Sequence, residues 1–269
     1  MLSFPNAKIN IGLYITGKQD NGYHNIETVF YPVPLYDILE VVPSEKRTTI
    51  NLSGIKIPCA PEENLVFKAW KTLHKAYDIP PVKINLHKLI PPGGGLGGGS
   101  SDAAFCLSNL NKQFKLGLDD AQLMEFALRL GSDCPFFIKN RPVFAQGRGE
   151  ITKNININLE GKHLLLVFPD IHINTGEFFK KTPIHAAGYD LRQLQVTDLS
   201  KWKHSIENKF EDYVFDTYPS LRNIKNELYK AGAEFAIMTG TGSVIYGIFT
   251  KKPNVKQHFS TLAYKLVTF

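Results

Sequence analysis

The stretch from residue 91 to residue 104 constrains this chain more than any other. It reads Pro-Pro-Gly-Gly-Gly-Leu-Gly-Gly-Gly-Ser-Ser-Asp-Ala-Ala, so six of its fourteen residues are glycine. Glycine adopts positive φ easily and leaves no Cβ between the backbone N–H groups and a ligand. The small, apolar run 103–110 predicts a helix, whose first N–H groups and positive dipole end would face the same ligand. Together these features predict a loop that binds a polyphosphate.

A flexible linker is the main alternative for this glycine run, because Gly/Ser-rich runs are usually linkers. The run is short and lies between the alternating pattern of Val82–Leu86 and a helix, which favours a phosphate loop. No lysine follows the glycines, so the run is not a Walker A loop. A dinucleotide site would need an acidic residue ending the next strand, whereas Asp119 and Asp120 resemble a helix cap. The protein-kinase motifs His-Arg-Asp and Asp-Phe-Gly do not occur.

The composition indicates a globular protein of one or two domains, with 43% hydrophobic and 21% charged residues in 269. The sequence has no 18-residue apolar run and no charged segment leading into an apolar one, so neither a membrane span nor a secretory signal is expected. The three cysteines, Cys59, Cys106 and Cys134, lack Cys-x-x-Cys spacing and predict reduced thiols in the cytoplasm, without zinc. The net charge of +6 suits a nucleotide or a nucleic acid equally, and the lysines form no basic tract.

Hydrophobic periodicity predicts a chain in which strands and helices alternate. In the first part we expect strands at 7–15, 38–42, 49–52 and 82–88, helices at 63–77, 103–110 and 119–130, a loop at 17–24, and a hairpin of 135–138 with 143–146. In the second part we expect strands at 163–168, 235–238 and 244–249, helices at 202–213 and 221–231, and a closing helix and strand. The polar stretch 154–162 is the candidate boundary, so we predict two α+β domains, residues 1–155 and 160–269.

Four stretches, in this order along the chain, resemble the GHMP kinases, the family of galactokinase, homoserine kinase, mevalonate kinase and phosphomevalonate kinase. Pro91–Ala104 resembles the family's phosphate loop, and Phe4–Gly12 followed by Gly-Tyr-His at 22–24 is similar to the opening of one member. Gly131–Phe136 resembles the catalytic segment, and Met238–Val244 resembles a glycine turn that closes on the phosphates. The resemblance implies a ribosomal-protein-S5-domain-2-like N-terminal domain and a ferredoxin-like C-terminal α/β sandwich.

The activity that the resemblance implies is ATP-dependent phosphorylation. The acceptor is the 2-hydroxyl of a cytidine-diphosphate-linked methylerythritol, and the products are the 2-phosphate and ADP, in non-mevalonate isoprenoid synthesis. ATP is the co-substrate. Mg²⁺ is expected on the phosphates, with Ser100 or Ser101 as a possible ligand and no dedicated protein cage.

By resemblance, Asp133 accepts the hydroxyl proton, and Lys8 lies beside it and lowers the pKa of that hydroxyl. From the residues alone, a capping or turn aspartate is the commoner role for an aspartate in Ser-Asp shortly before proline, as at Asp133. Lys8 falls on the opposite parity to the apolar residues of its strand, so we expect it on a polar face. The catalytic segment departs from the family at Ser132 and Cys134, where small apolar residues are usual. A buried Cys134 is a better interpretation than a nucleophilic one, because no base is identifiable beside it.

The resemblance assigns the substrate contacts to aromatic and polar side chains. Tyr23 is expected to stack on cytosine and His24 to bind its edge, while Thr175 and Phe179 supply a second aromatic wall for which Phe178 competes. Asn10 is expected to contact the sugar alcohol or the pyrophosphate, and Phe30 is the candidate for which core packing is the strongest alternative. The third motif adds Gly240, Gly242 and Ser243.

The resemblance also assigns the ATP contacts. Asn64 and Lys88 match adenine contacts of the family, although Asn64 could equally belong to an ordinary helix start. The phosphate-loop contacts are Pro91, Gly93, Gly94, Gly95, Leu96, Gly97, Gly98, Gly99, Ser100 and Ser101.

Two other functions remain as alternatives. Another GHMP kinase, acting on mevalonate, homoserine or a sugar, would have no use for the aromatic pair Tyr23 and Phe179. An RNA-binding protein would not need Lys8 beside Asp133, nor two separate glycine turns. We therefore expect the small-molecule substrate and ATP as partners, with no nucleic acid or membrane, and leave the oligomeric state open.

Overall fold

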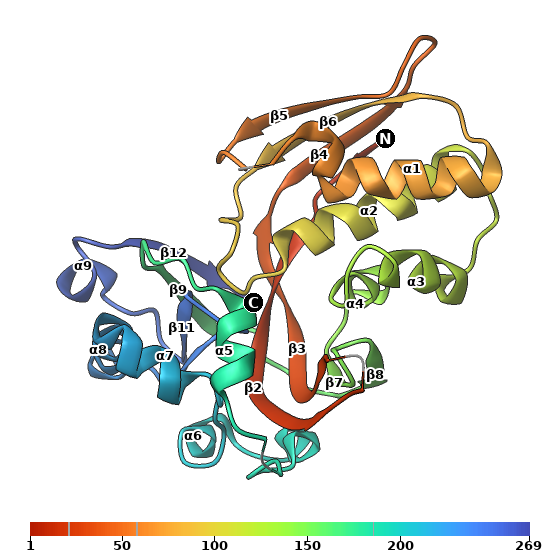
Figure 1. Cartoon of the computed structure of the whole chain (residues 1–269). Coiled ribbons are helices and arrows are strands. Elements are labelled where there is room, and N and C mark those ends of the chain that lie inside the picture. The colour runs from red at the N-terminus through yellow and green to blue at the C-terminus, as the bar shows by residue number, and fades with distance from the viewer. Residues whose placement is uncertain (21, 58, 185) are drawn as a thin grey trace. The chain divides into compact units, whose positions relative to one another are not determined.

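The computed structural model describes residues 1–20, 22–57, 59–184 and 186–269, with 180 and 181 described by their backbone alone. The chain (Figure 1) divides into two compact units, each built from several stretches of sequence. Unit 1 comprises Met1–Lys8, Leu35–Pro92 and Gly97–Arg141. Unit 2 comprises Ile9–Pro34, Gly93–Leu96 and Pro142–Phe269. The domain boundary expected between residues 155 and 160 stays a prediction.

Unit 1 contains one four-stranded sheet in the order β1-β4-β6-β5. Its strands are β1 (Leu2–Ser3), β4 (Ile38–Pro43), β5 (Thr49–Gly54) and β6 (Val82–Lys88), so the three longer strands match the expected ones. β6 pairs antiparallel with β4 and parallel with β5. Along β6 the apolar side chains are buried and Lys83 is exposed, as period-2 alternation predicts for a sheet with one covered face.

Helices of unit 1 cover the apolar face of that sheet and form the core with it. They are α1 (Leu65–Tyr77), α2 (Gly98–Gln113), α3 (Asp120–Leu128) and α4 (Cys134–Lys139), preceded by the 3₁₀ turn η1 (Pro61–Glu63). α1 and α2 run beside each other (Figure 1). The core joins residues of both helices, such as Leu73 and Leu107, to strand residues such as Ile84. The three helices expected in this part of the chain are confirmed.

The hairpin expected from 135–138 and 143–146 is wrong. Residues 134–139 form α4, which carries proline in its first turn, where the missing N–H costs nothing. Asn140 ends this helix in the left-handed conformation, at φ 50°. Only the second half of the expected hairpin is a strand, β7 (Val143–Gln146), and it pairs with β3 and β8 instead. A short aromatic run is compatible with either a strand or a buried helix, and here the buried helix is formed.

Unit 2 contains two sheets. The first has the order β2-β3-β7-β8, with β2 (Asn6–Lys18), β3 (His24–Tyr36) and β8 (Ile151–Asn154) beside β7. β2 includes the expected strand 7–15. β3 lies where we expected no strand, because its two prolines disguise the strand pattern. The expected loop 17–24 is shorter, residues 19–23, and Asn21 within it lies outside the described residues.

The second sheet of unit 2 is antiparallel, in the order β10-β11-β9-β12. Its strands are β9 (His163–Phe168), β10 (Phe235–Met238), β11 (Ile245–Phe249) and β12 (Ala263–Thr268), which match the expected ones. The helical segments are α5 (Thr175–Lys181), η2 (Leu191–Gln195), α6 (Leu199–Trp202), α7 (Glu211–Thr217), α8 (Pro219–Lys230) and α9 (Val255–His258). Within the described ranges, every helix is too short or too polar to cross a membrane.

The helix expected at 202–213 is wrong, because backbone pairing interrupts it. Leu13 in β2 accepts a hydrogen bond from the N–H of Lys209 and donates to the carbonyl of Glu207, both at 2.9 Å. Asn208, between them, donates from its amide to the carbonyls of Met238 and Gly240, at 2.8 Å each. These contacts pair the backbone around Asn208 with Leu13, so the helical segments stop at residue 202 and resume at residue 211.

Candidate active site

The first turn of α2 organises the polar groups of unit 1. Gly97, immediately before the helix, has φ +68°, and a Cβ there would lie 3.0 Å from both Lys8 Cγ and Phe137 Cζ. The position therefore requires glycine for its conformation and for the close approach of Lys8. A helix start leaves its first N–H groups without intrahelical acceptors, so these groups can bind phosphate oxygens. Lys8 is next to this predicted phosphate site, because it packs against Gly97.

Lys8 and Asp133 form the ion pair that the resemblance predicted. Lys8 Nζ lies 3.5 Å from Asp133 Oδ2, and the two side chains are 4% and 34% exposed, respectively. Burial lowers the pKa of Lys8, and Asp133 partly opposes that effect. Lys8 shares one face of β2 with Asn6 and Asn10, so the face is polar as expected, but it is buried, as is the whole strand from residue 6 to residue 15. Among the described residues, Asp133 makes no capping hydrogen bond to α4, and its side chain is partly exposed.

Cys134 is a buried packing residue, as expected. Its side chain is fully buried, and burial raises the pKa of the thiol to about 12. A Cβ on Gly131 would lie 3.3 Å from Cys134 Sγ and 3.9 Å from Ser100 Oγ. The catalytic segment thus packs directly on the first turn of α2, and the departure at Cys134 changes packing without adding a nucleophile.

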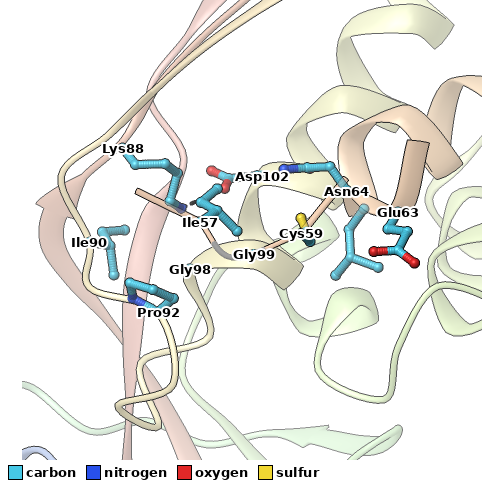
Figure 2. A pocket seen from close by; sticks show the side chains of 11 residues that line it. Ile57, Cys59, Glu63, Asn64, Lys88, Ile90, Pro92, Gly98, Gly99 and Asp102 are labelled. Atoms are coloured by element: carbon cyan, nitrogen blue, oxygen red, sulfur yellow. Dashed lines mark hydrogen bonds and ion pairs between the residues drawn. The ribbon is translucent and has the colours of Figure 1, made fainter. Parts of the chain in front are cut away.

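A cavity of about 190 Å³ is lined in part by residues at the start of the same helix. Figure 2 shows that side chains from η1, from β6 and from the first turn of α2 surround it. Two of the predicted adenine contacts, Asn64 and Lys88, line this cavity together with Gly98 and Gly99. The remaining lining residues are mostly apolar and suit a flat base. They were not predicted from the sequence, and they are Ile57, Cys59, Glu63, Leu65, Ile90, Pro92 and Asp102.

Asn64 also has the helix-start role that the sequence left open. It precedes α1, and its Oδ1 accepts the N–H of Val66 at 3.0 Å. The side chain is therefore held in place at the edge of the cavity by a capping bond, which orients the amide group.

Lys88 belongs to a buried cluster that the sequence did not reveal. Its ammonium is bound by the carboxylates of Asp37 and Asp102, the latter at 2.6 Å. Asp37 Oδ1 also accepts the N–H groups of Leu89 and Ile90, at 2.6 and 2.9 Å. The cluster thus fixes the end of β6 just before the glycine loop. One lysine carries a single positive charge, which cannot fully neutralise the negative charges of two buried carboxylates.

Asp102 is the carboxyl group of this cluster whose pKa is raised. Burial, partly opposed by Lys88 and reinforced by Asp37, raises the pKa of Asp102 to about 7. The unfolded chain would titrate near 3.9, so folding takes up a proton between these values, and stability falls as the pH rises through this window. We expect the free energy of unfolding to decrease by roughly 2–3 kcal/mol between pH 5 and 8 from this group. The variant Asp102→Asn should lose that dependence.

Urea denaturation of the wild type and Asp102→Asn at several pH values measures this difference. Asp198→Asn is the matched control, because Asp198 is 79% exposed in a surface pair with Lys201 and should leave the pH dependence unchanged. Parallel pH curves for wild type and Asp102→Asn would contradict the assignment.

In unit 2, the segment Gly93–Leu96 packs on the third glycine motif. A Cβ on Gly95, at φ +78°, would lie 2.1 Å from the carbonyl oxygen of Thr239, and one on Gly94 would lie 2.6 Å from Val244 Cγ2. Thr239 Oγ1 donates to the carbonyl of Gly95 at 3.2 Å. The two glycine motifs, 144 residues apart, therefore meet backbone to backbone.

Asn208 and Ser243 hold the third motif in shape. Asn208 binds the carbonyls on either side of Thr239, and Ser243 Oγ donates to the carbonyl of Ile171 at 2.6 Å. Gly240 and Gly242 both have positive φ, 58° and 92°. Asn208 was not among the predicted residues, because its role depends on contacts distant in sequence.

Asn10 is held within unit 2. Its Nδ2 donates to Thr28 Oγ1 at 2.9 Å, its backbone N–H donates to Thr239 Oγ1 at 3.0 Å, and its carbonyl accepts the hydroxyl of Tyr246 at 2.8 Å. Phe30 is 1% exposed, which fits the core-packing alternative.

The predicted base contacts gather at the start of β3 and on α5. His24 stacks on Phe179, with ring centroids 5.3 Å apart and planes at 26°, while Tyr23 is 55% exposed. Burial and nearby Lys18 lower the pKa of His24, which favours the neutral imidazole, a group with one hydrogen-bond donor and one acceptor. Phe178 is in the core of unit 2, which favours Phe179 over Phe178 as the second aromatic wall. Thr175 Oγ1 lies 2.9 Å from Thr241 Oγ1 of the third motif.

Two models of one family match the chain. The GHMP kinases N terminal domain matches residues 64–141, and the GHMP kinases C terminal domain matches residues 190–265. The chain belongs to the GHMP kinases. It is therefore an ATP-dependent small-molecule kinase, with ATP as co-substrate.

Within this family, two similar relatives carry the same name. The 4-diphosphocytidyl-2-C-methyl-D-erythritol kinase of Bacteroides fragilis is 46% identical over 95% of this chain and 94% of its own length. That of Chlorobium phaeobacteroides is 36% identical over 92% and 86%.

The solved structures agree with this similarity. A crystal structure of 4-(cytidine 5'-diphospho)-2C-methyl-D-erythritol kinase matches with a TM-score of 0.76, at 29% identity over 92% of this chain and 90% of that one. The mevalonate kinase of Methanococcus jannaschii, 12% identical over 100% of this chain and 98% of its own, shares the fold with a TM-score of 0.72. The expected two-domain α+β fold of the family is confirmed.

Proposed function

We propose that this kinase transfers the γ-phosphoryl group of ATP to the 2-hydroxyl of 4-diphosphocytidyl-2-C-methyl-D-erythritol, giving the 2-phosphate and ADP. This reaction belongs to non-mevalonate isoprenoid precursor synthesis. The observation that carries the proposal is the Lys8–Asp133 ion pair beside the first turn of α2. The names of the relatives support the choice of acceptor.

In the proposed mechanism, Asp133 accepts the proton of the acceptor hydroxyl as the oxygen attacks the γ-phosphorus. The bond from the γ-phosphorus to the β,γ-bridging oxygen breaks, and ADP leaves with that oxygen. Lys8 has its charge next to this carboxylate and to the glycine loop, where it stabilises the negative charge that develops. The N–H groups at the start of α2 bind phosphate oxygens, and the cavity beside Asn64 receives the base of ATP.

Mg²⁺ is proposed as a companion of the ATP phosphates, where it would neutralise their charge when bound. The residues present fit this role, because magnesium commonly keeps waters and takes one or two protein oxygens. Ser101 is fully buried, while Ser100 is partly exposed in the first turn of α2, so Ser100 is the better candidate of the two predicted ligands.

The acceptor is proposed to bind through its cytosine. Tyr23 and Phe179 offer aromatic surface for stacking, and neutral His24 offers a donor and an acceptor for the base edge. We propose the cytoplasm as the compartment, on the three free cysteines, and no nucleic acid among the partners.

A coupled ADP-release assay with ATP and magnesium tests the function. It compares 4-diphosphocytidyl-2-C-methyl-D-erythritol with mevalonate, homoserine and galactose at matched concentrations. Turnover with the cytidyl compound alone supports the proposal. Turnover with another acceptor would retain the kinase and overturn its substrate.

Removing the Tyr23 ring should weaken binding of the acceptor selectively. Stacking on a base contributes about 1–3 kcal/mol, so Tyr23→Ala should raise the KM for the cytidyl substrate roughly 5- to 150-fold and leave the KM for ATP within about twofold. Steady-state kinetics with each substrate varied in turn measures this. Tyr77→Ala, which removes another half-exposed tyrosine on α1, is the control and should change neither value. Equal effects of Tyr23→Ala on both KM values would contradict base stacking.

A further inference from the structure

The turn that joins β7 to β8 is built to present one arginine. Its residues are Gln146, Gly147, Arg148, Gly149 and Glu150. The N–H of Gly149 donates to the carbonyl of Gln146 at 3.1 Å, and the carbonyl of Gly147 accepts the N–H of Ile26 in β3 at 2.7 Å. These bonds anchor the turn to β3, two residues from His24.

Glu150 fixes the arginine within this turn. Its Oε2 accepts the backbone N–H of Arg148 at 2.5 Å, and its Oε1 lies 3.7 Å from Arg148 Nε. Gly147, at φ +69°, allows this arrangement, because a Cβ there would lie 2.9 Å from Glu150 Oε2. The Arg148 side chain is only 28% exposed, so the guanidinium is held in place close to the turn.

The guanidinium of Arg148 covers the ring of Tyr23. Arg148 Cζ lies 4.8 Å from the centroid of that ring, a distance typical of a cation–π contact. A flat guanidinium stacks on an aromatic ring in a way that a lysine ammonium cannot reproduce. Tyr23 itself is 55% exposed and its backbone is fixed by the bond from the N–H of Gln19 to its carbonyl, at 2.7 Å. Its ring therefore has surface available for a ligand while Arg148 restrains its orientation.

We propose that Arg148 is a positioning residue for recognition of the cytidine moiety, acting through the Tyr23 ring. An exposed side chain loses rotational freedom when a ligand immobilises it, and a ring already held in the bound orientation avoids most of that loss. The proposal rests on the proposed function, since it assumes that the ligand of Tyr23 is a cytosine base. It explains why the turn combines two glycines with an Arg–Glu pair next to a base-binding loop.

A double-mutant cycle tests this role, with cytidine 5′-diphosphate as the probe and isothermal titration calorimetry as the measurement. Arg148→Met removes the charge and the planar group but keeps an extended side chain. It should weaken binding about three- to tenfold in the wild-type background. In the Tyr23→Ala background the same change should alter the affinity less than about twofold, because the group through which Arg148 acts is gone.

Three comparisons keep the test specific. Arg222→Met removes one positive charge from the exposed pair with Asp216 in the same unit and should leave the affinity unchanged. Arg148→Lys keeps the charge and the partner Glu150, and is expected to restore less than half of the loss; it replaces Arg148→Met in the cycle if that variant fails to fold. In steady-state assays, Arg148→Met should raise the KM for the cytidyl substrate, leaving kcat and the KM for ATP unchanged.

Two results would overturn the inference while leaving the proposed function intact. The first is wild-type affinity in Arg148→Met. The second is an equal loss in both backgrounds, which would mean that Arg148 contacts the ligand itself, for instance its phosphates. If the wild type neither binds cytidine 5′-diphosphate nor phosphorylates the cytidyl substrate, the proposed function fails, and the inference fails with it.

Discussion

Replacing Asp133 with asparagine should lower kcat about a hundred- to ten-thousandfold while the affinity for ATP stays within a few-fold of the wild type. The variant keeps the shape of the side chain and removes the carboxylate that lies 3.5 Å from Lys8 Nζ. Without it, no group at this position can accept the hydroxyl proton. The glycine loop and the cavity beside Asn64, which do not depend on that charge, should still bind ATP.

Single-turnover kinetics and equilibrium ATP binding separate the two effects. Asp216→Asn, at an exposed aspartate paired with Arg222, is the control for loss of a surface carboxylate and should turn over normally. Normal turnover in Asp133→Asn would remove this residue from the mechanism, and a parallel loss of ATP affinity would indicate a structural role.

Replacing Gly95 with alanine should lower kcat/KM for ATP by at least about a hundredfold, because displacing a positioned group by an ångström has effects of this size. The added Cβ would lie 2.1 Å from the carbonyl oxygen of Thr239, so the loop or the third motif must move. The residue would also be strained at φ +78°.

Gly117→Ala isolates the conformational part of this effect. Gly117 has a similar φ of +72°, and a Cβ there meets no described atom within 4 Å. This control should lower the melting temperature by about 2–6 °C and leave the kinetics unchanged. If Gly95→Ala matched Gly117→Ala in both melting temperature and kinetics, the close packing of the two glycine motifs would not be required for activity.

Local pattern was sufficient for most of the fold. The strand at 82–88 alternates between apolar and polar residues as far as residue 87, and the helix at 63–77 has its apolar residues on one face, so each followed from its own residues. The segment 202–213 did not, because its residues 207–209 bond to Leu13 and to the carbonyl of Met238, which are distant in sequence. β3 was missed since prolines at 32 and 34 are unfavourable in most strands.

Some parts of the candidate site could likewise be predicted from the sequence, and others could not. The glycine loop could be interpreted from its residues, and Lys8 with Asp133 only through the ordered motifs of the family. The cluster of Asp37, Lys88 and Asp102 had no signal in the sequence, because its members lie between two strands, at a strand end and in a helix, and neither aspartate indicates which cation it will meet. The burial of Lys8 was hidden for the same reason, since β2 is covered on both faces by segments distant in sequence.

The way in which unit 2 is assembled has a consequence for synthesis on the ribosome. Its first residues, 9–34, share a core with β9, β10 and β11, as when Leu13 and Ile26 pack with Leu165 and Met238. These strands emerge well over a hundred residues before their partners, a delay on the order of ten seconds at typical translation rates. During that time β2 and β3 can pair with each other, but their buried apolar side chains lack the core that β9, β10 and β11 complete. Nascent chains of this protein should therefore depend on holding chaperones until β11, the last of these partners, is released.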